Sequence, residues 1–203
     1  MRLSSVFLLS ATDVAHFPTA AKTFDAPEVA FLGRSNVGKS SLINALLGVK
    51  LAHTSSTPGR TRAINFFALH EGQGDKKKQR PSLIFADLPG YGYAKISKSI
   101  SAEWPSFIEP YITDRETLAL GICLVDTNIP PQPSDTQLID FFKQTGRPFL
   151  VVGTKADRLS NNTLAKSLAV LKREHGVEEV LPVSTKNDAG IKKLWARLMA
   201  IAE

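Results

Sequence analysis

The chain has 203 residues, of which 43% are hydrophobic and 22% are charged. This length suits one compact domain, and the composition excludes a wholly disordered chain, a collagen-like repeat and a disulfide scaffold. The single cysteine, Cys123, lies in an apolar run, which fits a reducing compartment such as the cytoplasm. Lysine and arginine outnumber the acidic residues by 25 to 19, and the resulting net charge of +6 is compatible with a polyanionic partner.

The first residues predict a strand rather than a signal peptide. The apolar run within residues 5–10 is short, Asp13 interrupts the apolar character soon after it, and no clear cleavage pattern is present. No stretch of the chain approaches the ~20 apolar residues that span a bilayer, so we expect no membrane insertion.

Apolar runs alternate with amphipathic segments, which predicts an α/β domain whose sheet carries helices on its faces. The predicted strands are Glu28–Leu32, Ala63–Leu69, Leu83–Ala86, Leu118–Val125, Phe149–Val152 and Val180–Val183. The predicted helices are Lys39–Leu47, Ser134–Thr145 with Ser134 as its N-cap, Asn162–His175 and Ile191–Ala202, the first three ending at Gly48, Gly146 and Gly176. The polar residues 71–81 predict a hairpin tip. We expect one domain over residues 1–203, in which residues 1–26 add an extra strand to a core formed by residues 27–203.

A phosphate-binding loop is predicted between the first core strand and the first helix. Residues 33–40, Gly-Arg-Ser-Asn-Val-Gly-Lys-Ser, satisfy the pattern Gly-x-x-x-x-Gly-Lys-Ser/Thr in the strand–loop–helix context that it requires. Glycines let successive N–H groups face phosphate oxygens, and the helix N-terminus adds its positive dipole end. Lys39 is then expected to reach the β- and γ-phosphates, and the Ser40 hydroxyl to ligate magnesium. The alternative is a glycine-rich turn with a chance lysine, yet four fixed positions match by accident in only about 1% of such chains.

A second motif, Asp87-Leu88-Pro89-Gly90, comes directly after the predicted strand that begins at Leu83. Asp87 is expected to hold magnesium through water, and the N–H of Gly90 to contact the γ-phosphate. Taken alone, the same residues could form an ordinary turn after a strand.

Two later motifs indicate that the nucleotide carries guanine. In Thr154-Lys155-Ala156-Asp157, the Asp157 carboxylate can accept hydrogen bonds from N1 and the exocyclic amine of guanine, which adenine cannot supply. Lys155 is expected to cover the base with its alkyl stem, while Thr154 replaces the asparagine usual at that position. Residues 183–185, Val-Ser-Thr, end the last predicted strand, where a backbone N–H could meet the guanine carbonyl oxygen.

A switch loop is predicted at residues 55–62, between the first helix and the next strand. A threonine there can offer its hydroxyl to magnesium and its N–H to the γ-phosphate only while that phosphate is present. Thr57 and Thr61 are both candidates on chemistry alone, and a solvated basic loop is the alternative.

Together these motifs resemble the bacterial EngB family, also called YihA or YsxC, which are Era/TrmE-like GTPases of the translation-factor class. Asp87-Leu88-Pro89-Gly90-Tyr91-Gly92-Tyr93-Ala94 is the most specific part of a likeness that covers nearly the whole chain, and the family's Thr-Lys-x-Asp variant accounts for Thr154. The resemblance implies a three-layer, Ras-like P-loop GTPase domain with a mostly parallel six-stranded sheet. It implies nucleotide binding by Gly33, Arg34, Ser35, Asn36, Val37, Gly38, Lys39, Ser40, Ser41, Gly59, Arg60, Thr61, Arg62, Ala63, Asp87, Leu88, Pro89, Gly90, Thr154, Lys155, Ala156, Asp157, Val183, Ser184 and Thr185.

The resemblance also implies roles and partners. Mg²⁺ is held by Ser40, Thr61 and Asp87, the ligand is GTP or GDP, and Lys39, Thr61, Gly90 and Asn36 act in hydrolysis. The family is implicated in assembly of the large ribosomal subunit and in cell division and septation. We therefore expect a cytoplasmic monomer that acts on the large subunit or its precursor RNA and does not bind DNA. A scaffold for division proteins with incidental hydrolysis, and a small-molecule kinase, are the alternatives. The kinase is disfavoured by Asp157 and by the absence of an evident arginine-rich lid.

Slow hydrolysis is predicted from the residue next to Gly90. Ras-like enzymes place a water-orienting glutamine there, whereas this chain has Tyr91, whose phenol has an ordinary pKa of about 10. In similar GTPases the asparagine at the position of Asn36 helps to hold a potassium ion. The alternative is that Asn36 merely tolerates the backbone geometry of the loop.

The basic residues near the predicted switches could contact ribosomal RNA phosphates. They are Arg60, Arg62, Lys95 and Lys98. A second cluster at Lys76, Lys77, Lys78 and Arg80 is the weaker candidate, because a charge run on a loop is more often a solvated face. Trp104 and Trp195 are predicted to be core residues in helical segments. The histidines, at 16, 53, 70 and 175, show no metal-ligand spacing.

Overall fold

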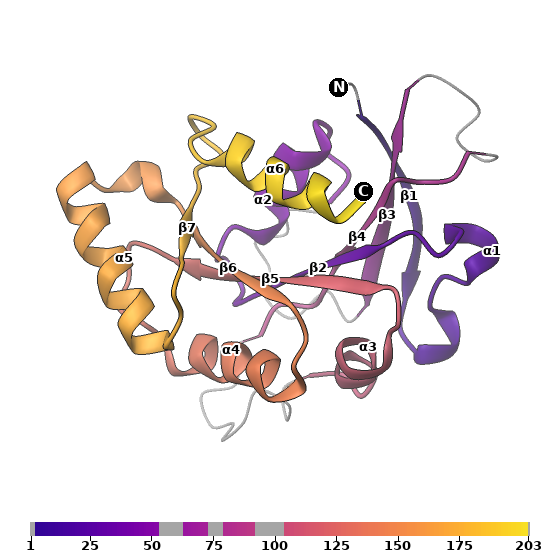
Figure 1. Ribbon diagram of the computed structural model, residues 1–203, viewed down its shortest axis with the longest axis horizontal. Helices are drawn as coiled ribbons and strands as arrows, with labels where there is room; N and C mark the ends of the chain where they lie inside the picture. Colours follow the sequence, from indigo (N-terminus) through magenta and orange to yellow (C-terminus); the bar gives the residue numbers. More distant parts are fainter. Residues whose placement is uncertain (1–2, 53–62, 73–78, 92–103, 203) are drawn as a thin grey trace.

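A computed structural model describes residues 3–52, 63–72, 79–91 and 104–202 (Figure 1). Within these residues a seven-stranded sheet has the order β1-β3-β4-β2-β5-β6-β7. The strands are β1 (Leu3–Ala11), β2 (Glu28–Gly33), β3 (Ile64–Glu71), β4 (Leu83–Asp87), β5 (Leu118–Asp126), β6 (Phe149–Thr154) and β7 (Leu181–Pro182). The helices are α1 (Ala20–Thr23), α2 (Lys39–Leu47), α3 (Ile108–Asp114), α4 (Pro133–Thr145), α5 (Asn161–His175) and α6 (Ile191–Ala202), with short 3₁₀ turns η1 (Val14–His16) and η3 (Ala156–Arg158).

The sheet is parallel from β4 through β2, β5 and β6 to β7, while β3 is antiparallel to both β1 and β4. The six predicted core strands and the predicted N-terminal strand are all present, so the α/β prediction is confirmed and the extra strand makes the sheet seven-stranded. The strands at the β1 end cross those at the β5 end steeply, as the right-handed twist of sheets requires (Figure 1).

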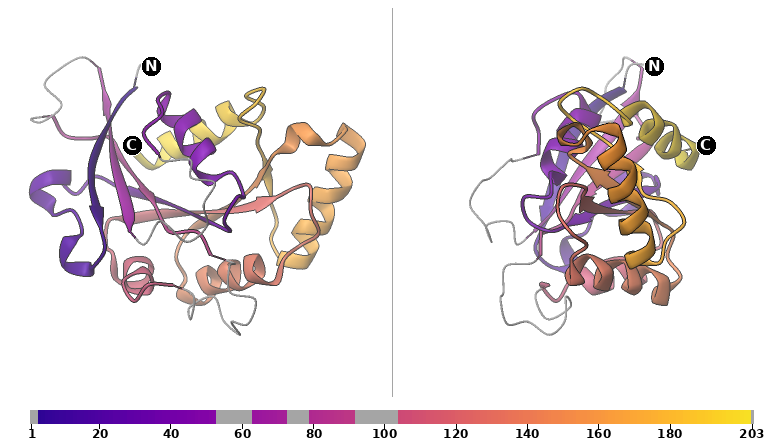
Figure 2. Two further views of the ribbon diagram at one scale, coloured as in Figure 1. Left: turned by 180° about the vertical axis from the view of Figure 1, so that it is seen from behind. Right: turned by 90° about the vertical axis from the view of Figure 1, so that its left-hand side faces the viewer.

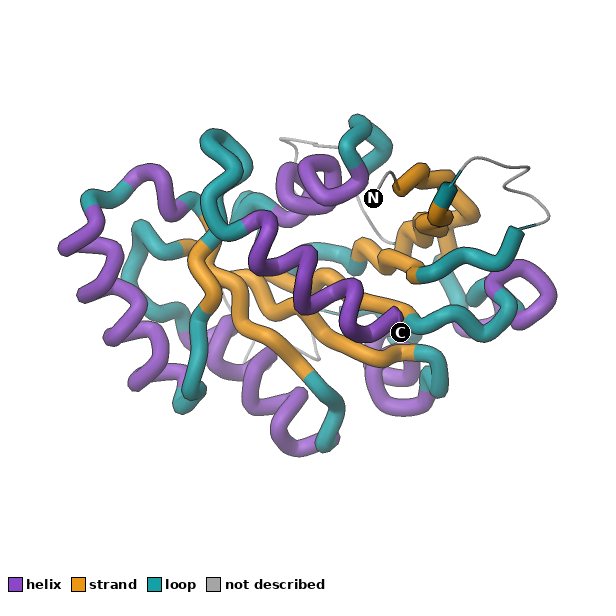
Figure 3. Tube along the Cα trace, turned by 45° about the horizontal axis from the view of Figure 1, so that its top comes forward, coloured by secondary structure: helices purple, strands orange, loops and turns teal. Residues whose placement is uncertain are grey.

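Helices cover both faces of the sheet, as Figures 2 and 3 show. The side chains of β2 alternate because successive residues of a strand point to opposite faces. Val29 and Phe31 pack with α2 and α6, whereas Ala30 and Leu32 pack with the buried residues of α3, α4 and α5. These four residues of the six in β2 are at most 1% exposed, which explains why the segment is almost continuously apolar.

Three sequence predictions about elements were wrong. The N-cap of α4 is Gln132 rather than Ser134, because Pro133 takes the first helical position, where its fixed φ and missing N–H cost nothing. The last strand spans only Leu181–Pro182 of the predicted Val180–Val183, although the N–H of Val183 still donates to the carbonyl of Gly153 at 2.7 Å. Trp104 precedes α3 and is not helical, although its predicted burial is confirmed by its edge-to-face contact with Phe141. The elements η1, α1 and α3 were not predicted.

A buried carboxylate joins the N-terminal extension to the core at the start of β2, the end of this strand opposite to the phosphate loop. Glu28 is 0% exposed and accepts hydrogen bonds from Arg115 Nε (3.0 Å), the Tyr111 hydroxyl (2.8 Å) and the Thr117 hydroxyl (2.9 Å). Arg115 also donates to the carbonyl of Pro18 at 2.8 Å. The charge is therefore paired and fully hydrogen-bonded, as a buried carboxylate must be.

Among the described residues, no helix combines the length and the apolar character needed to cross a membrane.

Candidate functional site

The predicted site residues gather where the parallel strands end. The strands β4, β5 and β6 run further than predicted and finish at Asp87, Asp126 and Thr154, each of which is at most 7% exposed. The carboxyl ends of parallel strands meet at one edge of a sheet, so these polar residues surround the loop that leaves β2.

That loop joins β2 to α2 with the geometry of an anion-binding turn. Gly38 is the N-cap of α2 and has φ +106°, a conformation that a side chain would strain. Residues 39–47 form the helix, whose N-terminus lies where the loop ends. The phosphate-loop prediction for residues 33–40 is thus matched by the local structure that the chemistry requires.

Lys39 and Asp87 form an ion pair at this edge. The ammonium nitrogen of Lys39 contacts Oδ1 of Asp87, and their side chains are 11% and 5% exposed. Ser40 comes next on the same helical turn and is half-buried. The pair therefore brings together Lys39, the lysine predicted to bind phosphate, and Asp87, the carboxylate predicted to bind magnesium.

Gly90 packs directly against the phosphate loop. A Cβ at this position would lie 2.9 Å from the Ser35 hydroxyl oxygen and 3.3 Å from the Ser35 backbone, so only glycine fits without a shift. The Ser35 N–H donates to the carbonyl of Tyr91 at 3.0 Å. The second motif is consequently held against the first through main-chain contacts.

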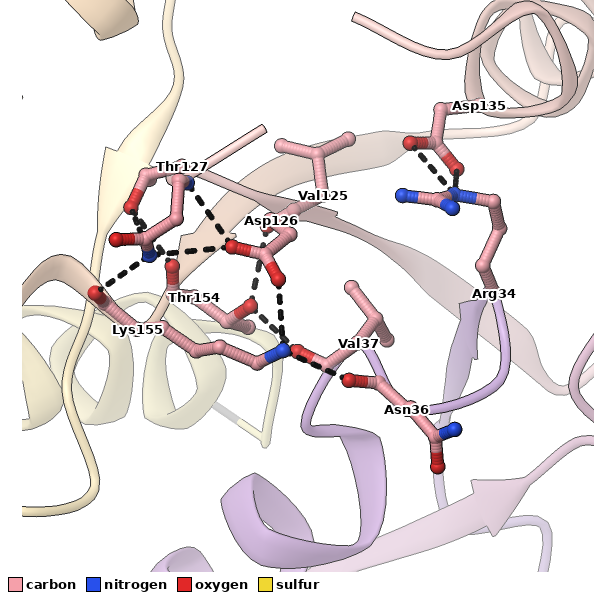
Figure 4. Close-up of polar contacts among 10 residues, drawn as sticks. Arg34, Asn36, Val37, Val125, Asp126, Thr127, Asp135, Thr154 and Lys155 are labelled. Carbon is pink, nitrogen blue, oxygen red and sulfur yellow. Dashed lines mark hydrogen bonds and ion pairs between the residues drawn. The ribbon is translucent and has the colours of Figure 1, made fainter. Parts of the chain in front are cut away.

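Thr154 ties the guanine-recognition motif to the phosphate loop. Its hydroxyl is buried and lies 2.6 Å from the carbonyl oxygen of Val37, a residue 117 positions away, and 3.2 Å from that of Val125 (Figure 4). A threonine therefore links the two motifs at the position where the guanine-recognition motif usually has asparagine.

Lys155 makes a second bridge from β6 to the phosphate loop. Its ammonium group donates to the carbonyl of Asn36 at 2.8 Å and to Oδ2 of Asp126 at 2.6 Å (Figure 4). Asn128 donates from its amide to the Lys155 carbonyl at 3.0 Å and to Asp126 at 3.2 Å. Burial raises the pKa of Asp126, but hydrogen bonds from Lys155 and Asn128 outweigh it and leave the pKa below its ordinary value. Asp126 is thus a carboxylate at neutral pH.

Asn36 has φ +63°, a left-handed conformation that asparagine tolerates better than most residues. Asparagine therefore suits the backbone of the loop at this position. The potassium interpretation stays a prediction.

Asp157 lies beside the loop that contains residues 183–185. Its Oδ1 accepts from the Ser184 hydroxyl at 2.6 Å, and this hydrogen bond is the main reason that the pKa of Asp157 falls below its ordinary value. The N–H of Ala156 donates to the carbonyl of Val183 at 3.1 Å. The two predicted guanine motifs are therefore adjacent, and the carboxylate is ionised at neutral pH.

The remaining predicted residues divide in two. Ser41, Leu88 and Pro89 adjoin the motifs above, and Leu88 donates its N–H to the carbonyl of Phe31 at 3.2 Å, whereas Ala63 directly precedes β3. The predictions for Thr57, Gly59, Arg60, Thr61 and Arg62, and for the basic residues Lys76, Lys77, Lys78, Lys95 and Lys98, lie outside the described residues.

Sequence reasoning missed three polar residues at this edge. Asp126 and Asn128 bind Lys155. The polar residues 126–128 at the end of the apolar strand β5 could have indicated them. Asp135, in the first turn of α4, binds Arg34 and Tyr91, and no pattern in the sequence points to it.

A family model described as 50S ribosome-binding GTPase matches residues 28–155. A protein of Acidobacterium capsulatum with the name Probable GTP-binding protein EngB is 58% identical over 202 residues, covering 100% of this chain and 92% of that protein. The protein of the same name from Koribacter versatilis is 54% identical over 202 residues, covering 100% and 96%.

Solved structures share the fold. The crystal structure of a probable GTP-binding protein EngB has a TM-score of 0.64 at 24% identity, covering 86% of this chain and 98% of that one. The Era protein of Aquifex aeolicus bound to GDP and AlF4⁻ has a TM-score of 0.67 at 24% identity, covering 87% and 56%. These likenesses confirm the P-loop GTPase fold.

Proposed function

Since this chain belongs to the EngB family of GTP-binding proteins, we propose that it hydrolyses GTP slowly and acts as a nucleotide-dependent switch in assembly of the large ribosomal subunit. In this proposal its action on the ribosome is needed for normal cell division and septation, and it works as a cytoplasmic monomer. The observation that carries the proposal is the direct link between Thr154 and Val37, because it joins a base-recognition motif to a phosphate loop.

Guanine selection is assigned to Asp157. An ionised carboxylate accepts from the two N–H groups on the guanine edge, and adenine leaves it unpaired, which is costly. Val183 and Ser184 already donate their N–H groups to Gly153 and Ala189, so the contact with the guanine carbonyl oxygen falls to the N–H of Thr185. The alkyl stem of Lys155 covers the base while its ammonium group holds the phosphate loop.

The phosphates and Mg²⁺ are assigned to Lys39, Ser40 and Asp87. A serine hydroxyl and one carboxylate are hard oxygen donors, and Mg²⁺ is commonly held by one or two carboxylates together with substrate phosphates. The donor set at the end of β4 and the start of α2 therefore fits the ion. Bound there, Mg²⁺ would neutralise charge that develops between the β- and γ-phosphates. The resemblance adds Thr61 as a further ligand.

Slow turnover is expected from the position of Tyr91. Its phenol is buried at 3% exposure and donates to Asp135 at 3.2 Å, while burial raises its pKa well above the ordinary value. A buried, protonated phenol cannot orient a water molecule as glutamine does in Ras-like enzymes. The same burial favours the second candidate, a nucleotide-gated scaffold for division proteins in which hydrolysis is incidental.

Potassium is the proposed substitute for a charge-stabilising side chain, with Asn36 helping to hold it. Replacing potassium by sodium should lower turnover severalfold, and Asn36→Ala should remove the difference between the two salts. Steady-state phosphate release in matched chloride salts measures both. Wild-type protein that hydrolyses GTP equally in the two salts would exclude this role.

The proposed partner is the large ribosomal subunit or its precursor RNA. The family model is described as a 50S ribosome-binding GTPase, and an Era protein of the same fold has been crystallised with nucleotides 1506–1542 of 16S ribosomal RNA. The net charge of +6 is compatible with RNA phosphates.

Two measurements test the proposal. Calorimetry with Mg²⁺ should detect GTP and GDP binding but not ATP binding, and equal affinity for ATP and GTP would overturn it. Sucrose-gradient co-sedimentation should then place the protein on the large subunit with a non-hydrolysable GTP analogue and not with GDP. Single-turnover hydrolysis with large-subunit precursor separates the two candidates, because only a ribosome-assembly GTPase requires stimulation.

A further inference from the structure

We propose that Asp135 is a positioning residue for the γ-phosphate end of the site. Its side chain holds the phosphate loop and Tyr91, the residue after Gly90, in one arrangement. The inference rests on the proposed GTP binding and hydrolysis. It concerns a side chain on α4 that none of the nucleotide-binding motifs contains.

One carboxylate serves two donors from distant segments. Both oxygens of Asp135 accept from Nε of Arg34, at 3.1 and 3.2 Å, and Oδ1 also accepts from the Tyr91 hydroxyl at 3.2 Å. The Asp135 side chain is 3% exposed, so these hydrogen bonds are shielded from water. Figure 4 shows that the ion pair of Asp135 with Arg34 lies on the opposite side of the phosphate loop from Lys155.

The two donors are also neighbours along the main chain. Arg34 and Tyr91 form an isolated parallel bridge, and the Ser35 N–H donates to the Tyr91 carbonyl at 3.0 Å. Gly90, immediately before Tyr91, lies so close to Ser35 that a Cβ would meet its hydroxyl oxygen at 2.9 Å. Fixing the Arg34 and Tyr91 side chains therefore fixes where the Gly90 N–H lies relative to the phosphate loop.

Stability alone does not account for an ionisable group at this place. Burial raises the pKa of Asp135 to about 6, despite the opposing effect of Arg34, so the ionised form is unfavourable there. An aspartate in the first turn of a helix also gains from the helix dipole, but an exposed position would give that gain without the burial. The carboxylate is instead placed where it can hold two donors at once.

The assignment makes a specific prediction because Gly90 is expected to contact only the γ-phosphate. Loss of the hydrogen bonds to Asp135 should weaken binding of a GTP analogue and leave GDP binding intact. If the role of Asp135 were purely structural, its replacement would lower the stability of the protein or weaken the binding of both nucleotides equally.

The test compares three full-length variants with the wild type. Tyr91→Phe removes only the phenol oxygen, Asp135→Asn removes the charge with little change in shape, and Asp140→Asn is the matched control on the same helix. Asp140 is exposed and pairs with Lys143. Affinities for fluorescent GDP and for a fluorescent non-hydrolysable GTP analogue are measured with Mg²⁺, alongside thermal unfolding and the kcat for GTP.

For Tyr91→Phe and Asp135→Asn we expect the dissociation constant of the GTP analogue to rise at least about fivefold and the kcat for GTP to fall. The dissociation constant of GDP should change less than about twofold. The reason is that the lost hydrogen bond to a charged group acts here only through the position of Gly90. Asp140→Asn should match the wild type in every measurement. A folded Tyr91→Phe variant with an unchanged ratio of GTP-analogue to GDP affinity overturns the inference, and this variant decides the matter if Asp135→Asn does not fold. Failure of the proposed function looks different, because the wild type itself would then bind no guanine nucleotide or would bind ATP equally well.

Discussion

Replacement of Thr154 by valine tests whether the guanine motif and the phosphate loop work as one unit. The change keeps the shape of the side chain and removes the hydroxyl that lies 2.6 Å from the Val37 carbonyl. Thr154 is 4% exposed, so water cannot take over the lost interaction. Loss of a buried hydrogen bond costs about 1–2 kcal/mol. For a domain of this size each kcal/mol lowers Tm by about 2–4 °C.

The affinity for nucleotide should fall with the stability. If half of this energy, about 0.5–1 kcal/mol, holds the phosphate loop in its binding geometry, GDP and a GTP analogue should both bind about two- to fivefold more weakly, since 1.4 kcal/mol is a factor of ten. Isothermal titration calorimetry and thermal unfolding of the same samples measure both effects.

Thr23→Val is the matched control for this prediction. Thr23 is 1% exposed and donates to the carbonyl of Thr19 at 3.2 Å, in the N-terminal extension away from the phosphate loop. It should lower Tm by a similar amount and leave nucleotide affinity unchanged. Equal losses of affinity in both variants, or a Thr154→Val variant that loses stability alone, would refute the link between the two motifs.

Three further outcomes are expected from the same contacts. Asp157→Asn should weaken the binding of GTP about 100-fold and favour xanthosine triphosphate, because the C2 carbonyl of xanthine accepts a hydrogen bond from the asparagine amide. Competition binding measures this change. Glu28→Gln should lower the free energy of unfolding by about 3 kcal/mol in urea titrations, because it leaves Arg115 without its buried carboxylate, and GDP affinity should not change. Because the folded-state pKa of Asp135 is raised to about 6, its contribution to stability is present at low pH and lost as the pH rises through 6. Lowering the pH from 7.5 to 5 should therefore stabilise the wild type by about 1 kcal/mol relative to Asp135→Asn. The charged groups that act on this carboxylate are Arg34, which lowers its pKa, and Asp126, which raises it.

The features that the sequence predicted are those whose chemistry is contiguous along the chain. The phosphate loop requires residues 33–40 to lie between a strand and a helix, and both elements have strong local signals. Asp87 and Asp157 were singled out as candidate site residues in the same way, because each comes after an apolar strand directly or after a short turn. The alternation of apolar and amphipathic segments predicted the layers for the same reason.

The features that could not be predicted depend on partners far apart in sequence. Asp135 is 101 residues from Arg34, and Thr154 is 117 residues from Val37. No spacing rule connects such pairs, because their proximity is a consequence of strand order in the finished sheet. The helix α3 was missed because residues 108–114 contain a proline and only one full turn of apolar periodicity.

The contacts made by β6 indicate how recognition of a base and of phosphates can be coupled. Thr154 and Lys155 bind the carbonyl oxygens of Val37 and Asn36, so they occupy none of the N–H groups that phosphate oxygens require. Thr154 and Lys155 thus hold the loop from the base side without occupying its N–H groups, of which those of Ser35 and Val37 donate to the carbonyls of Tyr91 and Arg34. On the far flank Asp135 holds the Arg34 side chain, again without engaging the donors of the main chain. A phosphate loop supported in this way loses little conformational freedom when nucleotide binds, so the proposed guanine contact at Asp157 would stabilise a geometry that the protein has already formed.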